Sequence, residues 1–286
     1  MAVPWLDPAD LPAGFVLDGR YRIERCLGGG FSSRVYRAED SSSGDKVAVK
    51  VLRDPSSKRF FREARIGTEL DHPHIVKVLG HGVVERTGAH YLTMELLEGE
   101  NLADVLRDRR VWEPAAVLPI IDQLASALFA AHQSGVVHRD VKPANIFVLA
   151  DGSVKLLDFG IAFELGNVRI TAPGALVGTP CNLAPEQVRL EEIDHRVDVY
   201  ALGVRVYRFL TGRMPFEARQ PQRVLIEIVR KVPRAPSEVL GRGSRLVDTI
   251  VMRALDKEPG LRFATVLDLA ESLRIAVEAD QGGGDP

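Results

Sequence analysis

The chain has 286 residues, of which 45% are hydrophobic, and its 37 Lys and Arg against 39 Asp and Glu give a formal net charge of −2. This balance excludes the basic footprint of a nucleic-acid-binding protein and a polybasic membrane anchor. The length exceeds one average domain but fits two lobes without a second independent module. No uninterrupted apolar stretch reaches the length of about 18 residues typical of a membrane span, so we expect no membrane segment.

Both ends of the chain are predicted to be tails. Three prolines punctuate residues 1–20, and a glycine-rich run closes residues 279–286. The start has neither a basic leader nor a continuous apolar segment, which argues against a secretory signal. The only two cysteines, Cys26 and Cys181, are typical of free thiols in a reducing compartment. We therefore expect a cytoplasmic protein.

The first part of the chain predicts a small β lobe over about residues 21–97. Three β-prone runs separated by Gly- and Ser-rich turns indicate an antiparallel meander. They cover residues 21–26, 34–38 and 46–52. One helix is expected to interrupt the meander, because Ser56 or Ser57 can cap an apolar stripe that ends before Pro73.

The remainder, about residues 98–278, predicts a larger and mainly helical lobe. Apolar residues recur there at helical spacing. The predicted helical ranges are 117–133, 201–210, 224–229, 246–255 and 266–277. A β lobe followed by a helical lobe makes an α+β fold.

A predicted β-hairpin brings two polar residues together. The apolar runs 146–149 and 154–157 are separated by a short segment that contains Asp151-Gly152, the preferred centre of a two-residue hairpin. Pairing about that centre places Asn145 opposite Asp158, about 5 Å away by ordinary cross-strand geometry. Two oxygen ligands at this separation suit magnesium.

Asp140 precedes Asn145 by five residues, on the loop that enters this hairpin. Its carboxylate can therefore reach a substrate hydroxyl while Asn145 and Asp158 hold metal and phosphates. One candidate base and two candidate metal ligands together predict phosphoryl transfer.

In these motifs the chain resembles the eukaryotic-type (Hanks-type) protein kinases. The catalytic-loop motif reads His138-Arg139-Asp140-Val141-Lys142-Pro143-Ala144-Asn145, and the metal-binding motif reads Asp158-Phe159-Gly160. The resemblance spans about residues 20–275 and is most like bacterial serine/threonine kinases. It implies a two-lobed protein-kinase-like fold over residues 21–278, ATP as the phosphoryl donor, and Mg²⁺, for which Mn²⁺ can substitute.

The resemblance includes a glycine-rich loop, in which Ser33 takes the third glycine position. Glycines there let backbone N–H groups close over phosphates. A dinucleotide-binding turn would lead into a helix, whereas β-prone residues follow here, and a merely flexible turn stays an alternative. The implied nucleotide contacts are Leu27, Gly28, Gly29, Gly30, Phe31, Ser32, Ser33 and Val35.

Lys50 matches the kinase lysine that contacts the nucleotide phosphates, and Glu63 is the implied helical carboxylate that orients it. Their separation of 13 residues is short beside many relatives, and Glu69 is a weaker alternative partner. The resemblance places Met94 at the position that guards the adenine pocket, just before the hinge. The implied adenine contacts are Ala48, Met94, Glu95, Leu97 and Phe147.

The acceptor side also resembles this family. Lys142, two residues past Asp140, matches the lysine of serine/threonine kinases, which neutralises charge on the transferring phosphate. Residues 158–186 resemble an activation segment that ends in Ala184-Pro185-Glu186. Asn182 stands at a commonly aromatic position of that segment, which predicts a changed acceptor preference.

Thr171 is predicted to be a phosphorylation switch, because phosphate on it could pair with Arg139 and order the segment. Thr179 is the rival site. Its Gly-Thr-Pro context better fits a hydroxyl that contacts Asp140 and Lys142.

Three further residues have implied structural roles. Asp198 resembles the buried aspartate of the large lobe that anchors the catalytic loop. Arg262 resembles the arginine that pairs with Glu186.

The sequence thus predicts an ATP-dependent serine/threonine protein kinase with Ser- and Thr-bearing protein substrates, and with autophosphorylation of its activation segment. A noncatalytic pseudokinase scaffold that binds nucleotide is the main alternative, favoured by Ser33, Asn182 and the short route to Glu63. A small-molecule kinase is a third reading, and the long activation segment argues against it. No nucleic acid is expected as a partner.

Overall fold

The structure, a computed structural model of the 286-residue chain, describes residues 7, 9–30, 33–53, 64, 67–108, 110–158 and 180–282. The chain divides into two compact units, Met1–Glu98 and Gly99–Pro286. This division lies one residue beyond the predicted boundary between the lobes.

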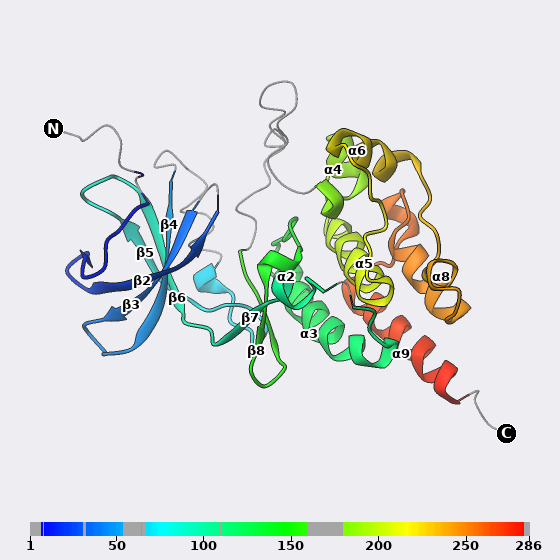
Figure 1. Ribbon diagram of the computed structural model, residues 1–286, viewed down its shortest axis with the longest axis horizontal. Helices are drawn as coiled ribbons and strands as arrows, with labels where there is room; N and C mark the ends of the chain where they lie inside the picture. Colours follow the sequence, from blue (N-terminus) through cyan, green and yellow to red (C-terminus); the bar gives the residue numbers. More distant parts are fainter. Residues whose placement is uncertain are drawn as a thin grey trace. The chain divides into compact units, whose positions relative to one another are not determined.

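The first unit is built on a six-stranded antiparallel sheet with the order β1-β2-β3-β4-β6-β5 (Figure 1). The strands are β1 Val16–Leu17, β2 Tyr21–Gly29, β3 Ser33–Asp40, β4 Lys46–Leu52, β5 Val78–Val83 and β6 His90–Glu95. The three predicted strands are confirmed, although β2 and β3 are longer than expected. The order departs from a simple meander where β6 pairs with β4. Strand β6 is buried over most of its length and β5 is half-exposed, which suits a central and an edge strand.

Successive side chains of β4 point to opposite faces of this sheet. The odd-numbered residues 47–51 join the main core cluster of the unit. On the other face, Leu52 packs in a smaller cluster with Ala64 and Leu92. Ala64 and residues 67–69 are helical, and the rest of the predicted helix lies outside the described residues.

The prediction of a tail over residues 1–20 is wrong for the described part of that range. Ala9 and Leu11 are buried in the main core cluster, and β1 pairs with β2. The hydroxyl of Tyr36 donates to the carbonyl of Ala9 over 2.6 Å and accepts from the N–H of Leu11 over 3.0 Å. Pro12 does begin a turn, in which its carbonyl accepts from the N–H of Phe15 over 3.1 Å, but proline spacing does not reveal that nearby apolar residues cover one face of a sheet.

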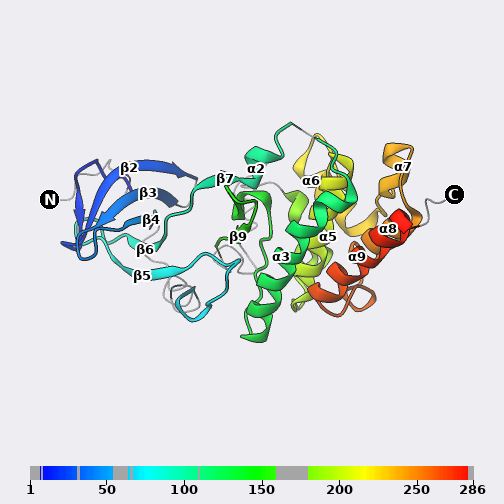
Figure 2. The ribbon, with the colours of Figure 1, turned by 90° about the horizontal axis from the view of Figure 1, so that it is seen from below.

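The second unit combines a small antiparallel sheet with packed helices (Figures 1 and 2). Its strands are β7 Gly99–Asn101, β8 Ile146–Leu149 and β9 Val154–Leu156. Its helices are α2 Leu102–Val105, α3 Pro114–Gln133, α4 Pro185–Arg189, α5 Arg196–Thr211, α6 Pro221–Arg230, α7 Pro236–Leu240, α8 Arg245–Ala254 and α9 Val266–Gly282. Short 3₁₀ turns cover Pro143–Asn145, Pro180–Asn182 and Pro259–Leu261. Each of the five predicted helical ranges overlaps one of these helices, and the range 246–255 extends one residue beyond α8.

Helix α5 forms the centre of the second unit and is buried on nearly all sides. It contacts α3, α7, α8 and α9, and Figure 2 shows α3, α5 and α9 side by side. Gly203 allows a close approach of α5 to α8, since a Cβ there would lie 2.7 Å from the Cβ of Ala254. A helix that is enclosed in this way can hold a loop in place from inside the core.

The C-terminal tail predicted over residues 279–286 is wrong at its start. Helix α9 continues to Gly282, so residues 279–282 are helical. No residue between Val266 and Gln281 is a glycine or a proline, so nothing in the sequence stops the helix before the glycine run.

Helix α3 is the single helix, among the described residues, that is long and apolar enough to cross a membrane by length and composition. Its mean hydropathy is 1.5 over the most apolar window. Its apolar side chains, such as Ile121, Leu124 and Leu128, are buried, and the helix packs against α5 and α9. These contacts are those of a core helix.

The predicted hairpin is confirmed as β8 and β9, but its register is wrong by one residue. Ile146 pairs with Leu156, and the N–H of Leu157 donates to the carbonyl of Asn145 over 2.8 Å. Asn145 is therefore opposite Leu157 and not Asp158. The reason is that the turn holds three residues, 150–152, and ends at Gly152 with a φ of 82°, so the Asp-Gly pair does not form a two-residue turn.

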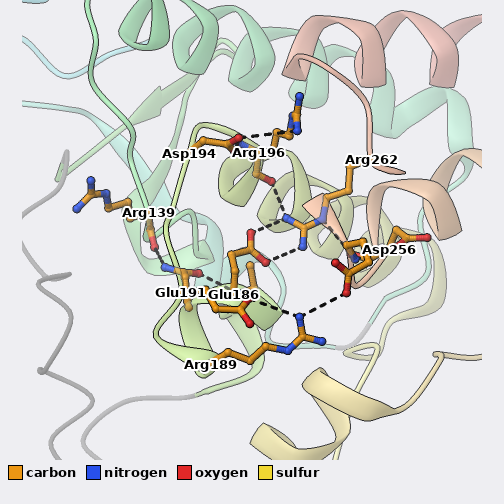
Figure 3. Close-up of polar contacts among 11 residues, drawn as sticks. Arg139, Glu186, Arg189, Glu191, Asp194, Arg196, Asp256 and Arg262 are labelled. Atoms are coloured by element: carbon orange, nitrogen blue, oxygen red, sulfur yellow. Dashed lines mark hydrogen bonds and ion pairs between the residues drawn. The ribbon is translucent and has the colours of Figure 1, made fainter. Parts of the chain in front are cut away.

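A buried ion pair joins α4 to the segment before α9. Both oxygens of the Glu186 carboxylate accept from the guanidinium of Arg262 over 2.7 Å (Figure 3). Arg262 also donates to the carbonyls of Asp256 and Arg196, and its guanidinium lies 4.9 Å from the ring centre of Tyr200. The predicted pairing of Arg262 with Glu186 is confirmed.

Glu186→Ala should lower the free energy of unfolding by about 3–5 kcal/mol, because the substitution leaves the Arg262 guanidinium buried without its counter-charge. Urea denaturation followed by circular dichroism measures the change. Glu271→Ala is the matched control, since it removes an exposed pair with Arg274 and should cost less than about 1 kcal/mol. Equal losses in the two variants would contradict the structural role of the buried pair.

Candidate active site

A buried carboxylate on α5 holds the loop that carries the candidate base. Asp198 accepts the backbone N–H of His138 over 2.9 Å and that of Arg139 over 2.8 Å. The Nε2 of His132 on α3 lies 2.7 Å from the same carboxylate. A carboxylate with no solvent exposure needs such donors, and here two of them are the backbone of the loop itself. The predicted anchoring role of Asp198 is confirmed.

The backbone bends sharply on both sides of the site. Arg139 has a φ of 67° and Asp158 a φ of 56°, in the left-handed region that residues other than glycine seldom occupy. Each such conformation costs on the order of 1–3 kcal/mol and persists where its surroundings hold it. Arg139 is held by Asp198 and by Gln187, whose Nε2 donates to the Arg139 carbonyl over 2.9 Å.

His138 ties the loop to the segment that precedes Asp158. Its Nδ1 accepts the N–H of Asp140 over 3.2 Å, so the ring proton lies on Nε2, which donates to the carbonyl of Leu157 over 2.9 Å. The buried imidazole of His138 thus fixes the backbone of Asp140 relative to Leu157, the residue before Asp158.

The carboxylate of Asp140 is oriented by two predicted site residues. Lys142 Nζ donates to its Oδ2 over 2.6 Å, and Asn145 Nδ2 donates to the same oxygen over 3.1 Å. Oδ1 accepts no hydrogen bond from any described residue. The carboxylate therefore has one oxygen held by the protein and one available to accept a proton from a substrate hydroxyl.

Asn145 has an amide orientation that suits a metal ligand. Its Nδ2 donates to the carbonyl of Asp140 over 2.9 Å and to the Asp140 carboxylate, so both amide protons are used. Its Oδ1 can therefore act as a metal ligand, and Mg²⁺ prefers oxygen ligands. The Asn145 carbonyl also accepts from Leu157, the residue before Asp158. The described residues contain no group of three His, Cys, Asp or Glu side chains that could hold a metal, so a metal here would depend on Asn145, Asp158 and phosphate oxygens.

In the first unit, four predicted nucleotide contacts share one face of the sheet. Val35 is directly opposite Lys50, and Ala48 is directly opposite Met94. Residues directly opposite each other in an antiparallel sheet point to the same side, as do residues two apart on one strand. Lys50, Ala48 and Met94 are all buried, so the register gathers a cation and apolar side chains on the face away from the main core.

The three glycines at the end of β2 differ in their surroundings. A Cβ at Gly28 or Gly30 would meet no atom of a described residue within 4 Å, whereas a Cβ at Gly29 would lie 2.9 Å from the carbonyl oxygen of Ser33. The Gly30 N–H also donates to that oxygen over 2.9 Å. Gly29 is thus required by contact between strands, while Gly28 and Gly30 leave the open space that close approach of phosphates needs.

The other predicted contacts have the following positions. Glu95 ends β6, and its carboxylate accepts the N–H of Lys77 over 2.8 Å. Phe147 on β8 is directly opposite Asn101 and Lys155. Leu27 is 40% exposed on β2, Ser33 begins β3, and Leu97 is half-buried beyond β6. The predicted residues Phe31, Ser32, Glu63, Thr171 and Thr179 lie outside the described residues.

Sequence reasoning missed two residues that hold the site. His132 binds Asp198, and Gln187 bridges the end of the activation segment to the catalytic loop, since its Oε1 accepts the N–H of Ala184 over 2.9 Å. Gln187 stands three residues after Ala184, the N-cap of α4, where a side chain that reaches back to the cap is common. That spacing could have identified it.

Asn182, predicted to shape the acceptor floor, has an unexpected partner. Its Oδ1 accepts from Nη2 of Arg205, a buried residue of α5. Next to it, Cys181 packs against the cluster of Phe216, Val224 and Ile228, and burial raises the pKa of its thiol. The sequence signal for Arg205 was a charged residue within the apolar stripe of a buried helix, and it was not recognised.

The comparisons with known proteins agree with this geometry. Residues 21–270 match the family described as "Protein kinase domain". A probable serine/threonine-protein kinase of Streptomyces coelicolor is 38% identical over 273 residues, which cover 92% of this chain and 40% of that protein. The serine/threonine-protein kinase PknB of Mycobacterium tuberculosis is 39% identical over 268 residues, which cover 90% of this chain and 43% of that protein.

Solved structures give the same result for the fold. The crystal structure of the Mycobacterium tuberculosis PknI kinase domain is similar with a TM-score of 0.74 and 28% identity, covering 93% of this chain and all of that one. The chain spans about two-fifths of the length of the curated relatives described above. The chain therefore belongs to the Hanks-type protein kinases, alongside the bacterial serine/threonine-protein kinases to which it is similar.

Proposed function

We propose that this chain transfers the γ-phosphoryl group of ATP to Ser and Thr hydroxyls of protein substrates. The observation that carries the proposal is the Asp140 carboxylate, whose Oδ2 is fixed by Lys142 and Asn145 and whose Oδ1 accepts no hydrogen bond from a described residue. The alternative of a noncatalytic scaffold finds no support, because the relatives are named as kinases.

In this mechanism the acceptor hydroxyl donates its proton to Asp140 Oδ1 as its oxygen attacks the γ-phosphorus. The bond to the β-phosphate bridging oxygen breaks, and ADP leaves. Lys142, 2.6 Å from Asp140 Oδ2, supplies a positive charge beside the transferring group. The transition state of phosphoryl transfer is loose, so the rate depends mainly on position and on charge neutralisation.

A divalent cation fits the donor set. Asn145 Oδ1 and the Asp158 carboxylate would hold Mg²⁺, and Mn²⁺ could take its place. When bound, the cation neutralises charge on the phosphates of ATP. The chain contributes the orientation of the ligands, since Asn145 is fixed through both amide protons.

ATP would be held by the face of the sheet that carries Val35, Ala48, Lys50 and Met94 and by the open backbone at Gly28 and Gly30. Glu63 is our proposed partner for Lys50, and Thr171 our proposed site of autophosphorylation. The cytoplasm is the proposed location, because it supplies ATP and keeps both cysteines reduced.

Asp140→Asn should lower the rate of phosphate transfer by at least about 100- to 1,000-fold, because the amide cannot take the hydroxyl proton. Lys50→Met and Asp158→Asn should cause comparable losses through the phosphates and the metal. Transfer from radiolabelled ATP to generic protein acceptors measures each rate. Asp104→Asn, at an exposed carboxylate of α2, is the control and should keep the parental rate. Parental turnover in folded Asp158→Asn would show that the site assignment is wrong.

Gly28→Ala and Gly30→Ala should each raise the Kd for ATP about tenfold or more while leaving the melting temperature near that of the parent, because the added methyl groups enter open space. Gly29→Ala should instead lower the melting temperature, since its methyl group meets Ser33. Isothermal titration and thermal unfolding separate the two effects. If Gly28→Ala bound ATP as the parent does, the proposed phosphate contact would be wrong.

A further inference from the structure

Arg205 is a charged side chain inside the core of the second unit. It lies on α5 between two valines, and only 1% of its surface is exposed. Nη2 donates to Asn182 Oδ1, whereas Nε and Nη1 are buried without a hydrogen-bond partner in the part of the chain that the structure describes. Buried guanidinium groups are normally paired with acceptors or carboxylates. Among the described residues, Arg205 is therefore a buried cation that has one neutral hydrogen-bond partner and no counter-ion.

The neighbours of Arg205 do not neutralise its charge. Burial, and then the positive charge of Arg208, lower the pKa of Arg205 to about 9, and the opposing effects of Cys181 and Asp140 are smaller. At neutral pH the side chain stays protonated. A buried charge is screened little by solvent, so an anion at the nearby surface would be attracted to it.

Asn182 separates this cation from the surface. The residue is partly exposed at the end of the 3₁₀ turn Pro180–Asn182. Because Oδ1 accepts from Arg205, Nδ2 keeps both of its protons, and neither takes part in a hydrogen bond with a described residue. The pair thus offers two amide donors, backed by a positive charge. Carboxylates and phosphates bind such donors strongly.

The pair lies close to the catalytic loop. Gln187, five residues past Asn182, donates to the carbonyl of Arg139, which directly precedes Asp140. The charge of Asp140 also acts on Arg205. Asn182 belongs to the segment that the resemblance assigns to acceptor binding, so an anion bound here would be part of the acceptor protein.

We propose that Arg205 and Asn182 form a recognition site for an anionic side chain, a carboxylate or a phosphate, that flanks the acceptor Ser or Thr in the protein substrate. The inference rests on the proposed function. It also gives a reason for the departure at position 182, because the asparagine amide can bind the guanidinium and an anion at once, with opposite ends.

The test uses acceptor peptides with one Thr among alanines and with Asp, phosphoserine or Arg placed at each flanking position in turn. For the parent chain, an anionic residue in at least one position should raise kcat/KM about tenfold over alanine, which corresponds to a charge-assisted contact. Arg in that position should lower it. The Asp and phosphoserine arms distinguish a carboxylate from a phosphate as the preferred anion.

Two variants test whether Arg205 and Asn182 cause the preference for anionic peptides. Arg205→Met and Asn182→Asp should each bring the ratio of kcat/KM between anionic and alanine peptides close to one, the first by removing the charge and the second by neutralising it in place. Arg205→Met should also raise the melting temperature, because an apolar side chain of similar length replaces an unpaired buried charge. Arg274→Met is the control and should keep the parental ratio, since this side chain of α9 is 39% exposed.

The experiment distinguishes failure of this inference from failure of the proposed function. If the parent phosphorylates none of the peptides and no generic protein acceptor, the proposed function itself is wrong. If it phosphorylates alanine peptides but favours no anionic position, the inference about Arg205 is overturned and the proposed function stands. An unchanged acceptor profile together with a lower melting temperature in Arg205→Met would show a purely structural role. Asn182→Asp decides the matter if Arg205→Met does not fold.

Discussion

The arrangement of the catalytic loop depends on the Asp198 carboxylate. It lies on α5, the helix enclosed by the rest of the second unit, and it accepts two backbone N–H groups of the loop. A loop is ordinarily the most mobile part of a fold. Here the core supplies its hydrogen-bond partner, so the stability of the helices is transmitted to the backbone at His138 and Arg139. The left-handed conformation of Arg139 can persist because this attachment offsets its cost.

Two further side chains, those of His138 and Asn145, connect this loop to the hairpin of β8 and β9. His138 connects the Asp140 backbone to Leu157, and Asn145 connects the Asp140 carboxylate to the hairpin that leads to Asp158. The candidate base and ligands are thus positioned relative to one another by the hydrogen bonds of His138 and Asn145. This is preorganisation, which a transition state stabilised mainly by charge requires.

Much of this could be predicted from the sequence, because strands and motifs are local. Strand β4 was placed at its observed bounds by its β-branched run, and alternation along it puts Ala48 and Lys50 on one face. The hairpin was recognised from Asp151-Gly152, but whether a turn holds two or three residues depends on backbone angles that the dipeptide does not fix. Asn145 was accordingly placed opposite the wrong residue.

Contacts distant in sequence could not be predicted in this way. The pairing of Asn182 with Arg205 joins residues that are 23 positions apart, and although each departs from the pattern of its own segment, neither departure identifies the other residue as its partner. The burial of Ala9 and Leu11 depends on the face of a sheet that forms later in the chain. Tertiary packing decides both cases, and single-sequence periodicity carries no information about it.

The position of Tyr36 has a consequence for where this folding unit begins. The family match starts at residue 21, yet the Tyr36 hydroxyl is satisfied by the backbone of Ala9 and Leu11. A protein cut at the family boundary would expose the apolar face that these residues cover and leave a buried hydroxyl unbonded. The region matched by the family and the region that packs into one core therefore have different boundaries. The family match begins at residue 21, whereas the packed core includes Ala9, which is 12 residues earlier.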